Sequence, residues 1–283
     1  IYMDNILFLE GQTYIPGGAL KTAHFMHING YAKSGMENVY FAGDMIGAWL
    51  YFRRSQDAEF RNIFCRGGGS DLGPYAQILI GDPQVSEETG DHPVNELVFS
   101  GYSHFEWGPN FGNVYIDPET GLSSSASRGS VAVKSDQPNV ASTANSCRWI
   151  GCKFEMATSR LWDGEANRKA AIYLRNSPMF QFLGCEFNQT SRQFDVSNCK
   201  ALEVRGKGFY GGGQGAADNR RRFGKWVNSD QLTVDVQFSF NGPSRGPIIN
   251  CPGHRVYVDS AIGTVGAPIA AMERKAEFGD LYK

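Results

Sequence analysis

A repeated frame around asparagine constrains the fold of this chain more than any other feature of its sequence. In four places an Asn is followed by a small residue, with an apolar residue two positions before the Asn and another six positions after it. The pairs are Asn176-Ser177, Asn198-Cys199, Asn228-Ser229 and Asn250-Cys251, spaced by 22, 30 and 22 residues. The flanking apolar residues are Leu174, Val196, Trp226 and Ile248 before the Asn, and Phe182, Val204, Val234 and Val256 after it. The period indicates a solenoid, because units of this size bury their apolar faces only by stacking.

The position of the Asn within this frame indicates a turn. Asn tolerates the left-handed αL conformation better than most residues, and its amide bonds to neighbouring groups. Stacked on successive coils, the four amides form a ladder within the wall. The sequence therefore predicts an all-β fold, a parallel β-helix with loop insertions. The content of 34 Gly, 19 Phe and 12 Tyr is typical of such a turn-rich β-protein.

The frame also suggests how the chain is organised. We expect the β-helix to span 1–269, with irregular opening coils over 1–142 and regular coils over 143–269. The remaining 270–283 is predicted to be a tail, either a short helix or a link to a missing C-terminal segment. Further strands are expected at 48–53, 58–64, 76–80, 96–99 and 130–134, and loops at 82–95, 102–128, 157–168 and 211–223. The start, Ile1-Tyr2-Met3-Asp4, is neither an initiator Met nor a signal peptide, which suggests a piece of a longer protein.

Charge and composition argue against several classes of partner. A net charge of −2 disfavours a nucleic-acid-binding surface. No run approaches 18 apolar residues, so we expect no membrane insertion. The six cysteines form no Cys-x-x-Cys pair and the histidines stand at no metal-ligand spacing, so we expect no metal and no cofactor. Cys152 and Cys185 occupy matching segments and point inward, which favours free thiols packed as small hydrophobes over a disulfide framework.

The same matching segments predict which side chains point outward. With Phe154 and Phe187 inside, Lys153 faces Glu186, and Glu155 faces Asn188, on strands about 4.8 Å apart. For Lys153 and Glu186 a surface ion pair is the favoured interpretation. Glu155 has no obvious partner and directly precedes the predicted loop at 157–168.

That loop carries the candidate site for catalysis. Glycoside cleavage needs two carboxylates roughly 5–10 Å apart, one as the acid and one as the base or nucleophile. The candidate catalytic residues are Glu155, Asp163 and Glu165, with Trp162 to stack on a sugar ring and Arg160 and Arg168 to hold an acidic saccharide. The alternative is that Trp162 caps the coil and the charges only solvate a loop.

A second candidate is the aromatic segment 102–115. Its Tyr102 and Trp107 present flat rings that suit a sugar-binding platform. Packing of a long loop onto the solenoid is the alternative. The basic run Arg220-Arg221-Arg222 is interpreted either as a site for a polyanionic glycan or, preferably, as a solvated loop tip.

Two motifs near the start carry a family resemblance. They are Gln12-Thr-Tyr-Ile-Pro-Gly-Gly18 and Met36-Glu-Asn-Val-Tyr-Phe-Ala-Gly43. In them the chain resembles the opening of pectate-lyase-like β-helices, which are right-handed and single-stranded. With its Asn turns and aromatic loop insertions, the chain resembles the central domain of a bacteriophage tailspike.

This resemblance implies a function as well as a fold. It implies a homotrimer that binds bacterial polysaccharide, capsule or O-antigen, and often cleaves it by hydrolysis or β-elimination. It also implies an extracellular place in the virion tail, joined to other tail proteins through missing segments. No catalytic motif is shared across tailspikes, so the candidate carboxylates rest on chemistry alone. The alternatives are a secreted cellular polysaccharide lyase or hydrolase, and a non-enzymatic receptor-binding or structural β-helix of a virion.

Overall fold

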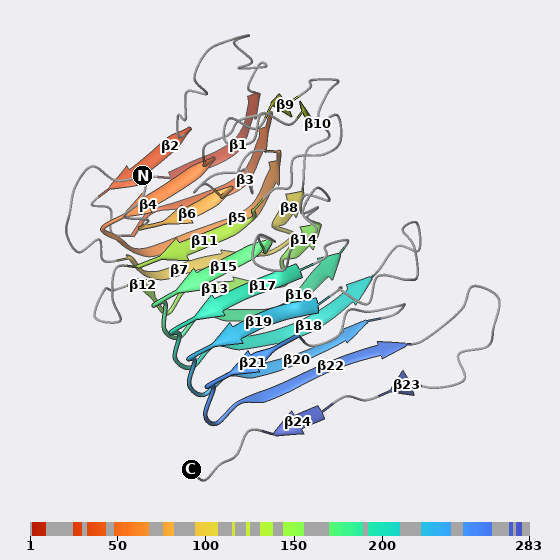
Figure 1. Cartoon of the computed structure of the whole chain (residues 1–283). Helices are drawn as coiled ribbons and strands as arrows, with labels where there is room; N and C mark the ends of the chain where they lie inside the picture. Colours follow the sequence, from red (N-terminus) through yellow and green to blue (C-terminus); the bar gives the residue numbers. More distant parts are fainter. Residues whose placement is uncertain are drawn as a thin grey trace, which may run out of the picture.

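The computed structural model of this 283-residue chain is a stack of β-strand coils (Figure 1). It describes residues 2–9, 25–29, 33–43, 48–67, 76–81, 94–106, 115–116, 123–124, 131–137, 144–155, 170–188, 192–209, 222–238, 246–261, 272–273 and 276–278. Every regular element within these ranges is a β-strand. The same ranges contain no helix of the length and apolarity needed to cross a membrane.

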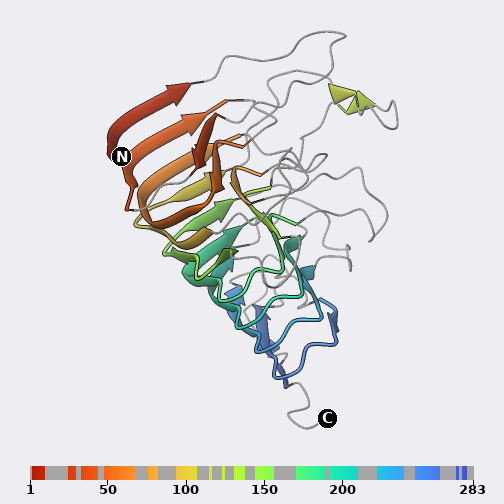
Figure 2. The same cartoon turned by 90° about the vertical axis from the view of Figure 1, so that its left-hand side faces the viewer.

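Two long parallel sheets form the wall, and the chain alternates between them from coil to coil. Sheet A contains, in spatial order, β1 (Tyr2–Leu9), β3 (Gly35–Ala42), β5 (Ser55–Arg66), β7 (Val94–Ser100), β13 (Arg148–Ile150), β16 (Gln181–Asn188), β18 (Glu203–Phe209), β20 (Thr233–Phe238) and β22 (Arg255–Ala261). Sheet B contains β2 (Met26–Asn29), β4 (Leu50–Arg53), β6 (Ile78–Ile80), β11 (Val133–Asp136), β15 (Ile172–Arg175), β17 (Arg192–Ser197), β19 (Arg222–Val227) and β21 (Ile248–Ile249). Figure 2 shows the strands following one another in chain order along the stack. The fold is therefore the parallel β-helix that the Asn repeat predicts.

Shorter strands complete the sheets. Next to the long strands of sheet A lie β8 (His104–Glu106), β12 (Ala144–Asn145) and β14 (Lys153–Glu155), while β9 (Tyr115–Ile116) and β10 (Ser123–Ser124) form a separate antiparallel pair. The prediction of a loop over 102–128 was therefore wrong at β8, which pairs with both β5 and β14. Near the end of the chain, β23 (Met272–Glu273) and β24 (Ala276–Phe278) pair antiparallel with β22. These residues of the predicted tail are therefore strands, and not the short helix that was one of the two predictions.

The repeated Asn residues occupy the turn from sheet B to sheet A, which we call the Asn corner. Asn176, Asn198, Asn228 and Asn250 all have positive φ, between 48° and 53°. Three residues after each Asn lies a second αL residue, and two residues later the next strand of sheet A begins. Along the stack, the residues at this second αL position are Lys33, Asp57, Glu96, Ser146, Met179, Ala201, Gln231 and Gly253. Ser146 thus aligns with Met179, which is why its neighbour Asn145 falls two positions away from Asn176.

The small residue after each Asn is buried and bonds between coils. The hydroxyl oxygens of Ser135 and Ser177 lie 2.7 Å apart. The backbone N–H of Cys199 donates to Ser229 Oγ at 3.1 Å, and that of Ser229 donates to Cys251 Sγ at 3.5 Å. All six cysteines are free and buried, as the sequence predicted. These side chains therefore satisfy buried polar groups of the neighbouring coil inside the wall.

A second line of αL residues divides the long strands of sheet A, and we call it the bulge column. Its members are Asn5, Asn38, Asn62, Gly101, Gly151 and Gly184. On its first coils the amides form a ladder, with Asn38 Nδ2 donating to Asp4 Oδ1 at 3.1 Å and Asn62 Nδ2 donating to Asn38 Oδ1 at 2.9 Å. The register of β16 and β18 shifts between Leu183 and Cys185, at Gly184. Bulges bend a strand, so the outer surface of sheet A has one part before the column and one after it.

Stacked aromatic rings fill the interior. One row runs through Phe60, Phe99, Trp149 and Phe182, with successive ring centroids 4.7, 5.6 and 4.7 Å apart. A second row runs through Phe105, Phe154 and Phe187, at 5.1 and 5.6 Å. All of these rings are fully buried. In-register parallel strands place like side chains on top of one another, so the same rows that fill the core fix the register of the outer face.

Candidate functional site

Charged side chains converge on the outer face of sheet A, beyond the bulge column. Phe105, Phe154 and Phe187 point into the core, so the residues on either side of each Phe point outward. In register across the strands, one outward row is Phe64, His104, Lys153, Glu186 and Lys207, and the next is Arg66, Glu106, Glu155 and Asn188. His104, Glu106, Lys153 and Glu155 form two adjacent pairs in these rows, and we call them the acid–base cluster.

Glu155 is the most contacted member of the cluster. Lys153 Nζ lies 2.7 Å from Glu155 Oε2, and His104 Nε2 lies 3.4 Å from the same oxygen. The side chains of Glu155 and His104 are 22% and 17% exposed, so this contact is largely shielded from water. The hydrogen bond to Glu155 raises the pKa of the Lys153 ammonium above its usual value.

These contacts revise part of the sequence-based interpretation. The predicted register is confirmed, because Lys153 pairs with Glu186 and Glu155 with Asn188. The ammonium of Lys153 nevertheless turns along its own strand to Glu155, while Glu186 accepts a hydrogen bond from Asn188 at 2.6 Å and lies 3.9 Å from Lys207. The prediction that Glu155 lacks a partner was wrong, because residues i and i+2 share a face of a strand.

Glu106 places a second carboxylate next to Glu155. The two residues are register partners on β8 and β14, and neighbouring strands lie about 4.8 Å apart. Glu106 Oε2 is 3.9 Å from Arg66 Nε, on the far side from Glu155. Two carboxylates on adjacent strands are the pair of groups that glycoside cleavage uses.

His104 adds a titratable group beside the two carboxylates, in the row of Lys153. Burial lowers its pKa below the usual value for histidine, and the positive charge of Lys153 lowers it further, against smaller opposing effects of Glu106 and Glu155. Its ring lies edge-on to Phe64, with centroids 4.9 Å apart. At neutral pH this environment favours the uncharged imidazole, which both accepts and donates protons.

An aromatic pair extends the outward row toward the start of the chain. Tyr40 and Phe64 stack with centroids 4.5 Å apart, on neighbouring strands β3 and β5. Both rings lie on the outer face, with Phe64 one coil and Tyr40 two coils before His104. The row therefore offers flat apolar surface beside the acid–base cluster, and aromatic rings bury a large apolar area when a ligand covers them.

The residues predicted from sequence are only partly brought together. Glu155 lies in the acid–base cluster, and Tyr102 is 90% exposed just before β8, where its N–H donates to Asn62 Oδ1 at 2.9 Å. Trp107, Arg160, Trp162, Asp163, Glu165 and Arg168 lie outside the described residues, as do Arg220 and Arg221. In sequence, 107–114 directly follows Glu106 and 156–169 directly follows Glu155, so both candidate segments start from the cluster.

Sequence reasoning missed His104 and Glu106. The signal was a triplet in which a polar residue, Phe and an acid or amide follow one another: His-Phe-Glu at 104–106, Lys-Phe-Glu at 153–155 and Glu-Phe-Asn at 186–188. The first copy stands in a segment without the Asn frame, so the frame alone predicts a loop there. Within the described ranges, no group of three or more His, Cys, Asp or Glu side chains is arranged to hold a metal ion.

Comparison with known proteins identifies no family for the chain. No known protein family matches the chain, and no curated protein matches it. Among solved structures, the chain is similar to ORF18 of Geobacillus virus E2, with a TM-score of 0.43 and 11% sequence identity. The similarity covers 88% of this chain and 41% of that one, so the chain spans less than half the length of the protein it resembles.

Proposed function

We propose that this chain is the β-helix of a bacteriophage tailspike-type protein, which binds a bacterial surface polysaccharide and cleaves it within the polymer. The observation that carries the proposal is the acid–base cluster, in which Glu106 and Glu155 are register partners on neighbouring strands. The stacked rings of Tyr40 and Phe64 in the same outward row support binding of sugar rings next to it. A long parallel outer face suits an extended polymer.

The favoured reaction is hydrolysis with Glu155 as the attacking group. Glu155 is paired with Lys153 at 2.7 Å, and His104 Nε2 lies 3.4 Å from the same oxygen. Its carboxylate attacks the anomeric carbon, the bond to the leaving oxygen breaks, and Glu106 gives that oxygen a proton. Water, deprotonated by Glu106, then hydrolyses the glycosyl ester on Glu155, so that the net change is the addition of one water. A separation of about 5 Å between the carboxylates is typical of this two-step course.

The test is incubation with a panel of purified capsular and O-antigen polysaccharides. New reducing ends and the ultraviolet absorbance of unsaturated uronate are followed together. Reducing ends alone establish a hydrolase, whereas absorbance as well establishes a lyase, in which His104 or Lys153 serves as the base. Glu155→Gln and Glu106→Gln are each expected to lower the rate at least 100-fold with binding retained, in the range that general acid–base groups supply.

Asp235→Asn is the matched control, because Asp235 is an exposed carboxylate of β20 outside the cluster. Its rate is expected to equal that of the unchanged protein. If Glu106→Gln turns over normally while Asp163→Asn or Glu165→Gln is inactive, the partner of Glu155 lies in 156–169 instead. Unchanged turnover in Glu155→Gln contradicts the assignment of the site.

Binding without cleavage is the second candidate function. Glu155 and Glu106 each face a cation, Lys153 and Arg66, as carboxylates do in ion pairs that only stabilise a wall. Retention of a polysaccharide without release of product favours this receptor-binding function. We also propose assembly as a homotrimer in an extracellular virion tail, together with other tail proteins. Sedimentation equilibrium of the purified chain tests the trimer.

A further inference from the structure

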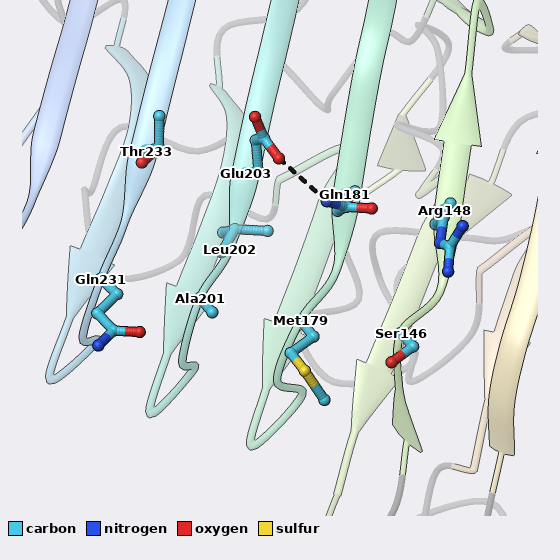
Figure 3. A pocket seen from close by; sticks show the side chains of 9 residues that line it. All are labelled: Ser146, Arg148, Met179, Gln181, Ala201, Leu202, Glu203, Gln231 and Thr233. Carbon is cyan, nitrogen blue, oxygen red and sulfur yellow. Dashed lines mark hydrogen bonds between the residues drawn. The ribbon is translucent and has the colours of Figure 1, made fainter.

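A line of hollows follows the Asn corner, on the outer side of sheet A before the bulge column. One hollow, of about 480 Å³, crosses the starts of β13, β16, β18 and β20 (Figure 3). A second, of about 520 Å³, crosses the starts of β3 and β5. We call this line the corner groove.

The two hollows occupy the same place on different coils. Gly35 and Glu59 line one, and Arg148, Gln181, Glu203 and Thr233 line the other, and all of these belong to one register row of sheet A. The second αL residues of the same coils form the other wall, among them Asp57, Ser146 and Ala201. In the strand order, β7 lies between the two hollows. The hollow over β13 to β20 spans three strand intervals of about 4.8 Å, or roughly 14 Å, and the hollow over β3 and β5 spans one.

The lining presents hydrogen-bonding groups at a regular interval. Arg148, Gln181, Glu203 and Thr233 each come from a different coil and point to the same side (Figure 3). Gln181 Nε2 donates to Glu203 Oε2 at 3.0 Å, which orients the amide. Small residues at the αL positions, such as Ala201, leave space along that wall of the groove. Met179, at the same position of another coil, is 47% exposed and adds an apolar contact.

Charges of both signs line the groove: the cations are Lys33, Arg61 and Arg148, and the anions are Glu37, Asp57, Glu59 and Glu203. In the hollow over β3 and β5, Arg61 lies 3.8 Å from Glu37 and 3.4 Å from Glu59. In the other hollow, Glu203 is paired with Arg205 at 2.6 Å. The described lining residues include no run of cations that would bind a polyanion. They also include no apolar centre of the kind that protein interfaces bury. Hydroxyl groups on an extended uncharged chain suit such a lining.

We propose that the corner groove binds a stretch of uncharged polysaccharide lying parallel to the helix axis, as a site separate from the acid–base cluster. The inference rests on the proposed function, because the ligand is the same polymer. In β16 the groove residue Gln181 and the cluster-row residue Glu186 are five residues apart, or roughly 16 Å along the strand, with the bulge of Gly184 between them. A chain in the groove therefore does not cross the cluster. It holds a second segment and raises the effective concentration of cleavable bonds.

The test fills the groove without touching the cluster. Ala201→Trp places a large ring in the hollow at a residue that already carries a Cβ at positive φ. Gln181→Ala and Thr233→Ala together remove polar groups with no added bulk, so they test the groove even if the Trp variant folds poorly. Affinity for intact polymer is measured by gel retardation with the panel of capsular and O-antigen polysaccharides, in a Glu155→Gln background that prevents cleavage.

Both groove variants are expected to lower the affinity for polymer at least tenfold. Cleavage of oligosaccharides too short to reach the groove, measured with Glu155 intact, is expected to stay unchanged. Ile249→Trp is the matched control, since Ile249 is 45% exposed on sheet B, and it is expected to bind normally.

Three results overturn the inference. If both groove variants bind polymer as tightly as the Glu155→Gln protein does, while cleavage still depends on Glu155, the groove is not a binding site. The proposed function then stays in place. A changed oligomeric state in the groove variants identifies the groove as a protein contact. If the unchanged protein neither binds nor cleaves any polysaccharide of the panel, the proposed function fails and this inference fails with it.

Discussion

At the scale of single residues, the Asn of the repeat serves the fold in two separable ways. The backbone of all four takes the αL conformation at little steric cost, and the amides of Asn176 and Asn250 also donate to a group on the preceding coil. Asn176 Nδ2 donates to the buried carbonyl of Gln137 at 2.6 Å, and Asn250 Nδ2 donates to Asn228 Oδ1 at 3.2 Å. The buried bond matters more, because losing it leaves a carbonyl without a partner away from water.

Replacement of Asn176 separates the two contributions. Asn176→Ala loses both the αL tolerance and the bond to Gln137, and we expect it to lower the free energy of unfolding by about 2–4 kcal/mol. Asn176→Gly keeps the backbone conformation and loses only the bond, so it is expected to cost about 1–3 kcal/mol. Urea denaturation followed by circular dichroism measures both. Equal loss in the two variants would show that the αL conformation contributes nothing.

At the scale of elements, the packing of stacked strands decides which glycines are replaceable. Gly208 in β18 lies in register with Phe187 in β16 and Phe238 in β20. A Cβ at Gly208 would overlap a ring carbon of Phe238 and lie 2.6 Å from the carbonyl oxygen of Phe187. A Cβ at Gly184, in the bulge column, meets nothing within 4 Å, although its φ is +63°.

These two glycines form a matched pair for mutation. Gly184→Ala is expected to lower the free energy of unfolding by about 1–2 kcal/mol, because the strain of positive φ is its only cost. Gly208→Ala is expected to cost about 3 kcal/mol or more, because a ring and a strand must both shift. Chemical denaturation of the two variants side by side gives the comparison. A larger loss for Gly184→Ala would contradict the close packing of Gly208 against the Phe238 ring and the strand of Phe187.

The sequence predicted elements well where the frame repeats and poorly where it is absent. From Asn176 to Val256, two flanking apolar positions and one Asn per coil were enough to place the turns and the parallel strands. The acid–base cluster was only half predicted. Glu155 was found because its strand matches the next coil, but Glu106 was not. Its strand, β8, is separated from β11 by the 26 residues 107–132, and the repeat frame around Asn is absent from that coil.

At the scale of the whole molecule, one continuous interior protects every thiol. The cysteines are spread from Cys65 to Cys251, and none is more than 6% exposed. Burial raises the pKa of the Cys147 and Cys199 thiols to about 12, so the reactive thiolate is scarce at neutral pH.

Thiol labelling therefore reports on the integrity of the whole stack. At neutral pH, Ellman's reagent is expected to react with the native protein at least 100-fold more slowly than with the protein in 6 M guanidinium chloride, a factor of the order that burial and scarce thiolate give. Six equivalents are expected to react after unfolding. Fewer than six would indicate a disulfide. Rapid labelling of several thiols in the native protein would contradict a closed interior.

The Asn corner has constant length, and this has a consequence for how such a protein changes over generations. In each of the four repeats the next strand of sheet A begins five positions after the Asn, whereas the return to sheet B takes 3 residues after β16, 12 after β18 and 16 after β14. In these four coils the variable lengths therefore lie at the end of sheet A where Glu106 and Glu155 stand, whereas earlier in the chain 13 residues separate β6 from β7 at the other end. A lineage can exchange the segments around these carboxylates, and with them the ligand that the protein recognises, without changing how the coils stack.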